Sequence, residues 1–285
     1  MTTALPVVDA PGPPMPALDI DAELAATWLE AFLYDELVVR RKIERAVLGL
    51  SGGVDSAVVA YLSARALGPH NVHCIRMPYT SSSPDSLADA QAVIDALGCG
   101  AHTIEIGDAV DGYLRLEPGA DARRRGNVMA RTRMLVLFDQ SAKLGALPVG
   151  TGNKTERLMG YFTWHADDSP PVNPIGDLFK TQVWQLARYL GVPARVIAKA
   201  PSADLEANQT DESDLGITYE EADRILALML EGYADEKIVA RGIAPADVAL
   251  VRNRVDSTHW KRHLPTTAML SNSAINEFYL RPVDF

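Results

Sequence analysis

The chain alternates short apolar runs with longer segments in which apolar residues recur at near-helical spacing. The apolar runs have the length of buried strands and lie at residues 46–50, 72–77, 101–106 and 146–150. The other segments predict helices at 19–42, 57–67, 89–97 and 127–144. Strands that alternate with helices are joined by crossover connections. The pattern therefore predicts an α/β fold: a doubly wound, parallel, Rossmann-like sheet with helices on both faces.

The last third of the chain is predicted to be rich in helices. Helical spacing predicts a helix at 180–190 and, beyond it, an α-rich C-terminal part with helices at 218–230 and 245–255. Residues 203–216 are polar and acidic without periodicity, which predicts a mobile loop. Residues 1–17, rich in proline and alanine, predict a disordered tail, and 271–285 a C-terminal tail. We expect a single domain over 18–270.

A glycine turn follows the first predicted strand and leads into a predicted helix. Ser51, Gly52 and Gly53 form it, because two adjacent glycines permit unusual backbone conformations and let a ligand approach the main chain. The free N–H groups that open the helix predict an anion site, with Ser51 and Ser56 as hydroxyl donors. Asp55 would repel a bound phosphate unless a cation lay between them. The turn therefore predicts phosphate together with Mg²⁺.

Two other phosphate-binding loops do not match this turn. The Walker loop needs a lysine after its last glycine, and the dinucleotide fingerprint needs Gly-x-Gly-x-x-Gly; residues 49–56 have neither. The structural alternative is a plain glycine turn that joins a strand to a helix. The order strand, serine, two glycines, Asp-Ser and helix disfavours that alternative.

A second loop, from Gly150 to Glu156, is predicted to meet the first. Ligands of a doubly wound sheet bind beyond the carboxyl ends of the strands, and both loops follow predicted strands. Thr151 offers a hydroxyl there, and Glu156 a carboxylate that pairs with Asp55 as a second ligand for a metal ion. Taken alone, Glu156 has the alternative of a charge at a helix N-terminus.

Composition narrows the class of protein. With 27 Lys+Arg against 37 Asp+Glu the net charge is −10 and no basic tract is present, so nucleic acid is not an expected partner. Cys74 and Cys99 form no CxxC pair, which fits a reduced compartment. No apolar run has membrane-spanning length, and no signal-peptide pattern opens the chain. We therefore expect a cytoplasmic protein without a membrane partner.

The turn at Ser51 resembles the SGGxDS loop of the PP-loop ATP pyrophosphatases, which bind ATP and release pyrophosphate. Further blocks follow in order at 127–134, 149–156, 160–163, 173–182 and 201–205. Together they are similar to the amidating domain of the NAD synthetase family, from about residue 20 to about residue 265. The alternative is another PP-loop adenylating amidase or ligase that acts on a different carboxylic acid.

The resemblance implies a ligase that forms a C–N bond. In this family the carboxylate of deamido-NAD attacks the α-phosphate of ATP, and ammonia then displaces AMP from the adenylate to leave NAD. Such chemistry needs neutralisation of charge on the triphosphate more than it needs an acid or base. The implied cofactor is Mg²⁺, with ATP as co-substrate.

The resemblance also implies residues for the ATP site. Those matched to ATP are Gly49, Leu50, Ser51, Gly52, Gly53, Val54, Asp55, Ser56, Thr151, Lys180 and Ser202. Asp55 and Glu156 would ligate Mg²⁺, and these two with Lys180 would carry the catalysis. Without the resemblance, Lys180 would be interpreted as a solvated lysine on the helix at 180–190.

The resemblance is weaker on the deamido-NAD side. The matched residues are Arg131, Trp164, Pro171, Trp260 and Lys261. Trp164 stands where many family members have lysine, and Pro171 where they have aspartate. Trp164 is interpreted either as a stacking surface for a ligand ring or as a cap on the edge of the core. Arg131 has apolar neighbours at helical spacing, which predicts a partly buried guanidinium that needs an anion from a ligand or an internal ion pair.

The remaining expectations concern the nitrogen source and the partners. Glutamine-using family members carry a glutaminase domain before the ATP loop, and fewer than fifty residues precede it here. Free ammonia is therefore expected as donor, unless a separate glutaminase subunit supplies it. The family implies a homodimer, and a loop matching 203–216 that closes over the site. A non-enzymatic alternative, an adenine-nucleotide sensor on a similar sheet, leaves Asp55, Glu156 and Lys180 without a task.

Overall fold

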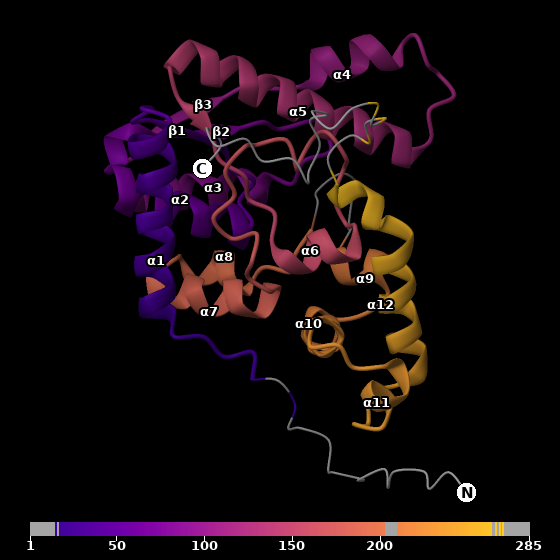
Figure 1. The fold of residues 1–285 in the computed structure, drawn as a ribbon. Coiled ribbons are helices and arrows are strands. Elements are labelled where there is room, and N and C mark those ends of the chain that lie inside the picture. Colours follow the sequence, from indigo (N-terminus) through magenta and orange to yellow (C-terminus); the bar gives the residue numbers. More distant parts are fainter. Residues whose placement is uncertain are drawn as a thin grey trace, which may run out of the picture.

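A parallel sheet of four strands organises the part of the chain that the computed structural model describes, residues 17–202 and 210–263 with Met15, Thr266, Ala268 and Leu270 (Figure 1). The strands are β1 (Ala46–Gly49), β2 (Val72–Arg76), β3 (Gly100–Thr103) and β4 (Leu147–Pro148), in the order β3-β2-β1-β4. Every pairing is parallel. The predicted α/β fold is confirmed.

The strand order places a reversal point between β1 and β4. The chain runs outward from β1 to β2 and β3, and α5 (Ala122–Leu144) then returns it to the other side of β1. Val47 pairs with His73 on one side and with Pro148 on the other. At such a reversal the connections leave the two strands in opposite directions and open a crevice at their carboxyl ends. The loops that begin at Leu50 and Gly150 follow these two strand ends, and we call the place where they meet the crevice.

Helices cover both faces of the sheet (Figure 1). One layer contains α1 (Ala22–Tyr34), α2 (Val54–Leu67), α3 (Pro84–Leu97), α7 (Lys180–Leu190) and α8 (Ala194–Ala198). The opposite face carries α4 (Gly107–Leu114) and α5, with Val47, Ile75, Leu137 and Ala146 packed between helix and sheet.

Helix α2 lies at the centre of its layer. Its residues from Ala57 to Ala64 are all buried, and it contacts α1, α3, α7 and α8. The helix predicted at 57–67 is therefore present, but the expectation that it is amphipathic, with one buried and one exposed face, is wrong. Small alanine and serine side chains let helices pack around α2 on several sides.

A second hydrophobic core supports the C-terminal helices. These are α9 (Asp211–Leu215), α10 (Tyr219–Leu230), α11 (Asp235–Val239), α12 (Pro245–Thr258) and the 3-10 helix η3 (His259–Arg262). Tyr219, Ile225, Leu226 and Val251 belong to this core, and Met159 of α6 (Lys154–Met159) joins it from the crevice side. The predicted α-rich C-terminal part is confirmed.

Some predicted boundaries differ from the structure. The helix predicted at 89–97 begins at Pro84, because Ser83 caps Asp85 N and proline suits the first helical position. The strand predicted at 101–106 ends at Thr103. Of the predicted loop 203–216, residues 203–209 lie outside the described residues, but Asp211–Leu215 form α9, which Thr210 caps.

The helix predicted at 19–42 divides into two parts. α1 begins after its cap Asp21, and a π-helix, Asp35–Arg40, follows it. Leu24, Trp28 and Phe32 are 55%, 70% and 40% exposed, although their spacing suggested a buried face. The apolar pattern covers a wider arc of the helix than the face that packs on α2 and α7.

Two other expectations concern the terminal tails and membrane-spanning helices. Most of the predicted tail 1–17 and all of the tail 271–285 lie outside the described residues. Within the described ranges, no helix combines the length and the hydropathy needed to cross a membrane.

Candidate active site

The turn after β1 has a shape that only glycine permits at its centre. Gly52 has a φ of +82°, and a Cβ on it would lie 2.2 Å from the carbonyl oxygen of Ser86 in the first turn of α3. Two backbone segments therefore touch at this point. Leu50 N donates to Ile75 O at 2.9 Å, which ties the start of the turn to β2. The turn is held by its neighbours on two sides.

Ser51 and Ser56 hold the turn from within. Ser56 Oγ donates to Gly53 O at 3.0 Å, and the two serine hydroxyls lie 3.1 Å apart. Gly53 caps α2 without a side-chain hydrogen bond. Among the described residues no side chain caps the first N–H groups of α2, which lie beyond the carboxyl end of β1 and would be available to an anion there.

Asp55 and Lys180 form an ion pair in the crevice. Lys180 is the first residue of α7, and its side chain is 2% exposed against 16% for Asp55. Its Nζ also lies 5.1 Å above the ring of Tyr219. Burial is the largest single effect on the pKa of Lys180 and lowers it, but the charges of Asp55, Glu156 and Asp211 and the hydrogen bond to Asp55 together raise it by more, so the net pKa lies above the ordinary value. The interpretation of Lys180 as a solvated lysine is wrong.

Asn153, which sequence reasoning did not single out, joins Asp55 to Glu156. Its Nδ2 donates to Asp55 Oδ1 at 3.0 Å, and its Oδ1 accepts from Glu156 N at 2.9 Å. Glu156 Oε2 accepts from Asn153 N at 3.1 Å, which completes a capping box for α6. An asparagine three residues before a glutamate is the sequence signal of this box. The two loops predicted to converge do so here.

The charges around Glu156 fit a divalent cation. Burial and then the charge of Asp55 raise the pKa of Glu156 to about 8, while Lys180 opposes the rise. When Glu156 is ionised as well as Asp55, two carboxylates share one ammonium and the group carries excess negative charge. Mg²⁺ is commonly held by one or two carboxylates together with phosphate oxygens and water. In the described part of the chain no group of three or more His, Cys, Asp or Glu is arranged to hold a metal, so Asp55 and Glu156 would share the ion with a phosphate.

A second polar group beside the ion pair was also missed. Asp211 is buried and accepts from the hydroxyls of Tyr219 at 3.0 Å and Tyr161 at 3.2 Å. Its charge contributes to the raised pKa of Glu156, so it lies within electrostatic reach of the crevice. The acidic composition around Asp211 predicted a mobile loop, and nothing local distinguished this aspartate from its neighbours.

Thr151 and Ser202 lie at the margins of these groups. Thr151 follows the end of β4 and is half-buried. Ser202 is exposed, and Pro201, which precedes it, accepts a hydrogen bond from Asp211 N at 2.9 Å. Ser202 is thereby placed near the Asp211 group.

Four residues predicted on the deamido-NAD side form one cluster. The rings of Trp164 and Trp260 pack edge to face with centroids 5.1 Å apart. Arg131 donates to the carbonyl oxygen of Trp164 at 3.2 Å. Lys261 Nζ donates to Gly160 O at 2.7 Å and also to Phe162 O. Contacts between α5, the segment after α6 and η3 therefore bring these residues together.

One prediction for the deamido-NAD side is wrong, and one predicted residue lies outside the cluster. Arg131 is exposed, so the partly buried guanidinium predicted from its apolar neighbours is wrong. Leu135, one helical turn later, is 63% exposed as well, so the face of α5 that carries these two residues lies away from the core. Pro171 is exposed and lies next to Val172, which bridges to Val149 beyond β4.

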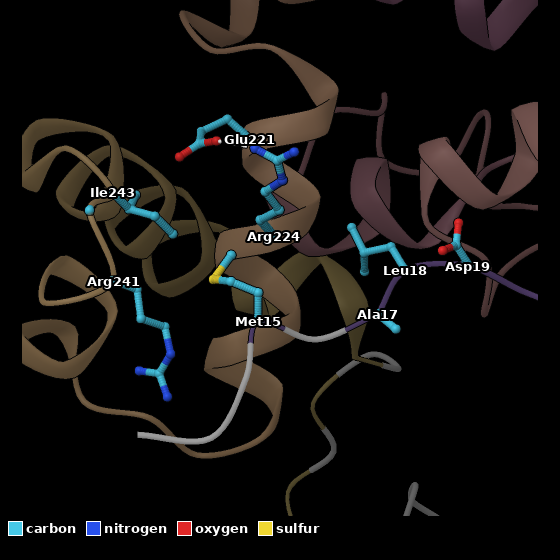
Figure 2. Close-up of a pocket in the computed structure, with 9 residues that line it drawn as sticks. Met15, Ala17, Leu18, Asp19, Glu221, Arg224, Arg241 and Ile243 are labelled. Carbon is cyan, nitrogen blue, oxygen red and sulfur yellow. Dashed lines mark hydrogen bonds and ion pairs between the residues drawn. The ribbon is translucent and has the colours of Figure 1, made fainter. Parts of the chain in front are cut away.

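A cavity of about 510 Å³ lies elsewhere, between the segment before α1 and the region of α10 and α11 (Figure 2). It is lined by Met15, Ala17, Leu18, Asp19, Glu221, Arg224, Arg241, Gly242 and Ile243. Arg224 pairs with Glu221 at 3.3 Å, and Arg241 stacks over the ring of Tyr233. None of the predicted site residues lines this cavity. The crevice between the two loops remains the candidate active site.

Comparison with known proteins points to one family. Residues 26–265 match the family model described as NAD synthase. The NH(3)-dependent NAD(+) synthetase of Trichlorobacter lovleyi is 49% identical over 263 residues, which cover 92% of this chain and 96% of the relative. The solved NH3-dependent NAD synthetase of Campylobacter jejuni, in complex with nitrate, is 30% identical with a TM-score of 0.75, over 88% of this chain and 100% of its own.

A second solved structure, the NMN synthetase of Francisella tularensis, is 31% identical with a TM-score of 0.79, over 88% of this chain and 99% of its own. The sequence match extends across both loops, the ion pair and the C-terminal helices. The chain therefore belongs to the NAD synthase family.

Proposed function

We infer that the protein is an ammonia-dependent NAD synthetase, a ligase that forms a C–N bond. It converts ATP, deamido-NAD and ammonia to AMP, pyrophosphate and NAD through an adenylated deamido-NAD. The observation that carries this inference is the meeting of the glycine turn with Asp55, Glu156 and Lys180 in one crevice. Relatives named NH(3)-dependent NAD(+) synthetase, of which the chain covers 96% in one case, support the same reaction.

The residues proposed to bind ATP would stabilise the negative charge of its phosphate groups. The N–H groups of the turn at 49–56 and of the first turn of α2 would donate to phosphate oxygens, while Ser51 and Ser56 keep the turn in shape. Lys180, buried and charged, would stabilise the pyrophosphate as it leaves. Thr151 and Ser202 would contact ATP from the margins of the crevice.

Asp55 and Glu156 are proposed to hold Mg²⁺. Both oxygens of Asp55 already have partners, Lys180 and Asn153, but each carboxylate oxygen accepts more than one bond. Asp55 can therefore hold a metal ion without losing the lysine. The bound ion would neutralise negative charge on the triphosphate during attack by the deamido-NAD carboxylate.

The acceptor is proposed to bind at the cluster of Arg131, Trp164, Trp260 and Lys261, with Pro171 at its edge. An exposed guanidinium suits a phosphate or a carboxylate. The aromatic pair offers a ring surface where a pyridine or adenine could stack. The similarity to an NMN synthetase makes a mononucleotide acid the specific alternative acceptor within the same chemistry.

Free ammonia is the proposed nitrogen donor, with a separate glutaminase subunit as the alternative. We also propose a homodimer in a cytoplasmic setting, with neither nucleic acid nor membrane as partner. The buried free thiols of Cys74 and Cys99 fit a reduced compartment. The acidic net charge of −10 disfavours nucleic acid.

Product analysis tests the proposal directly. The enzyme is incubated with ATP, Mg²⁺ and either deamido-NAD or nicotinic acid mononucleotide, with ammonium or glutamine as nitrogen donor. NAD, AMP and pyrophosphate formed from ammonium and deamido-NAD are expected, with little product from glutamine. Turnover of the mononucleotide alone would replace the proposed acceptor, and the absence of any ATP turnover would overturn the proposed enzyme activity.

A further inference from the structure

Helix α7 carries Lys180 at its first position, and its own Gln182 accepts from the backbone of the N-cap residue, Phe179 N, at 2.9 Å. Phe179 occupies the N-cap and makes no side-chain cap hydrogen bond. Residues of two other helices satisfy the first N–H groups instead. Thr155 Oγ1 accepts from Lys180 N at 3.0 Å, and Asp223 Oδ2 accepts from Thr181 N at 2.9 Å. The start of α7 is therefore capped by its tertiary neighbours.

Asp223 of α10 is the centre of this arrangement. Its side chain is 0% exposed and lies among the second hydrophobic core. Besides Thr181 N, it accepts from Thr155 Oγ1 at 2.5 Å and from Thr181 Oγ1 at 2.8 Å. A buried carboxylate is costly unless hydrogen-bonded, and these three donors satisfy both of its oxygens. Three helices therefore contribute to this hydrogen-bonded group: α6 with Thr155, α7 with Thr181 and α10 with Asp223.

The partners of Asp223 are the immediate neighbours of two active-site residues. Thr155 precedes Glu156 in the first turn of α6, and Thr181 follows Lys180 in the first turn of α7. One carboxylate therefore holds the two helical turns that carry the proposed metal ligand and the phosphate-side cation.

We propose that Asp223 is a positioning residue of the synthetase reaction, an inference that rests on the proposed function. Through Thr155 and Thr181 it fixes α6 against α7, so that Glu156 and Lys180 meet Mg·ATP in one geometry. A displacement of about 1 Å at such groups costs on the order of 100-fold in rate.

Two variants perturb the arrangement with little change in volume. In Asp223→Asn the side-chain oxygen must face Thr181 N, so the amide NH2 faces Thr155 and the Thr155 hydroxyl loses its acceptor. Thr155→Val removes the hydroxyl that accepts from Lys180 N. Both should lower kcat/KM for ATP by about 10- to 100-fold, with KM for deamido-NAD changed by less than about two-fold. Thr155→Ser, which keeps the hydroxyl, should recover most of the activity lost in Thr155→Val.

Ile225→Val is the matched control for loss of stability. Ile225 is fully buried on the same helix, and the substitution removes one methyl group from the hydrophobic core. It should lower the melting temperature while both kinetic constants stay within about two-fold of wild type. All assays are made below the melting transition of every variant.

The proposal is overturned if folded Asp223→Asn and Thr155→Val keep kcat/KM for ATP within about two-fold of wild type, or if KM for deamido-NAD rises in parallel. A wild-type enzyme that makes no NAD refutes the proposed function separately. Calorimetric titration with Mg·ATP then decides the role of Asp223. Binding about ten-fold weaker in Asp223→Asn than in wild type supports positioning, and equal binding overturns it.

Discussion

Asn153 donates from its side-chain amide to Asp55 at 3.0 Å, across 98 residues of sequence, while its backbone N–H donates to Glu156 at 3.1 Å. One asparagine thereby sets the spacing of the two carboxylates proposed to hold Mg²⁺. The same side chain caps α6, so the local stability of that helix and the geometry of the site depend on one residue.

Asn153→Ala should therefore affect stability and activity together. Loss of the cap costs about 1 kcal/mol of unfolding free energy. Loss of the hydrogen bond to Asp55 should lower kcat/KM by about 10- to 100-fold. Urea denaturation and steady-state kinetics measure the two effects. Asp21→Ala, which removes the cap of α1 far along the chain from both loops, is the control and should lose stability alone. Equal kinetic losses in both variants would contradict a specific role for Asn153.

Lys180→Met should leave Asp55 without its cation in a partly buried position. Breaking such a pair costs about 3 kcal/mol of stability, and removing the cation from the phosphate side should lower kcat by at least about 100-fold. The double variant Asp55→Asn/Lys180→Met should regain much of the lost stability but none of the activity. Denaturation midpoints that fall further in the double variant would show that the two side chains are not coupled.

The raised pKa of Glu156 makes the stability of the metal-free protein depend on pH. Because burial and Asp55 raise this pKa from 4.5 to about 8, the folded state binds a proton that the unfolded state has released between these values. This contribution is fully present below about pH 4.5 and is lost as pH rises through about 8. Melting temperatures from pH 5 to 8.5 should fall more steeply in wild type than in Glu156→Gln.

If Glu156 is a ligand of Mg²⁺ as proposed, the ion should oppose this fall, because it would bind the ionised carboxylate and displace the proton. The ion is therefore expected to raise the melting temperature more at pH 8.5 than at pH 6.5, and to have little effect on Glu156→Gln. Identical pH slopes in the two proteins would mean that Glu156 does not carry the proton.

Gly52→Ala tests the close approach of the turn to α3. The added Cβ would lie 2.2 Å from Ser86 O, a backbone atom that cannot swing away as the end of a flexible side chain could, so the turn at 51–53 must move. Gly68→Ala is a closely matched control, because Gly68 has the same φ of +82° but open space around its Cβ. The control should lose about 1–2 kcal/mol of stability from backbone strain alone. Only Gly52→Ala should also weaken ATP binding in a calorimetric titration, by more than about ten-fold.

Trp164→Ala separates the two interpretations of this tryptophan. If its ring stacks on the acceptor, KM for deamido-NAD should rise by about five- to 100-fold while KM for ATP is unchanged. Trp28→Ala, at a tryptophan 70% exposed on α1, should change neither constant. An unchanged KM for deamido-NAD in Trp164→Ala would leave Trp164 as a side chain that caps the core edge beside Trp260.

The elements that sequence reasoning predicted well are those with local causes. The apolar run before Gly49, the glycine pair and the helix after it are neighbours in the chain, so their order alone indicated strand, turn and helix. The helix at 180–190 was predicted at its observed bounds for the same reason. Helices α4, α8 and α11 were missed because they are short and their apolar residues are too few to show a period.

The sequence by itself determined the family, the parallel α/β fold and the two loops that converge at the carboxyl ends of β1 and β4. Motifs and resemblance had already assigned Asp55, Glu156 and Lys180 to one site, but only the tertiary structure decided which contacts join these side chains to each other and to Asn153. Lys180 reaches Asp55 across 125 residues and Asp223 reaches Thr181 across 42, so no periodicity of the chain encodes these contacts. The exposure of Arg131 and the burial of Asp211 were decided in the same way, because both depend on which neighbouring elements cover a side chain. Local sequence sets the conformation of a segment, whereas the packing of helices sets the environment of its charges.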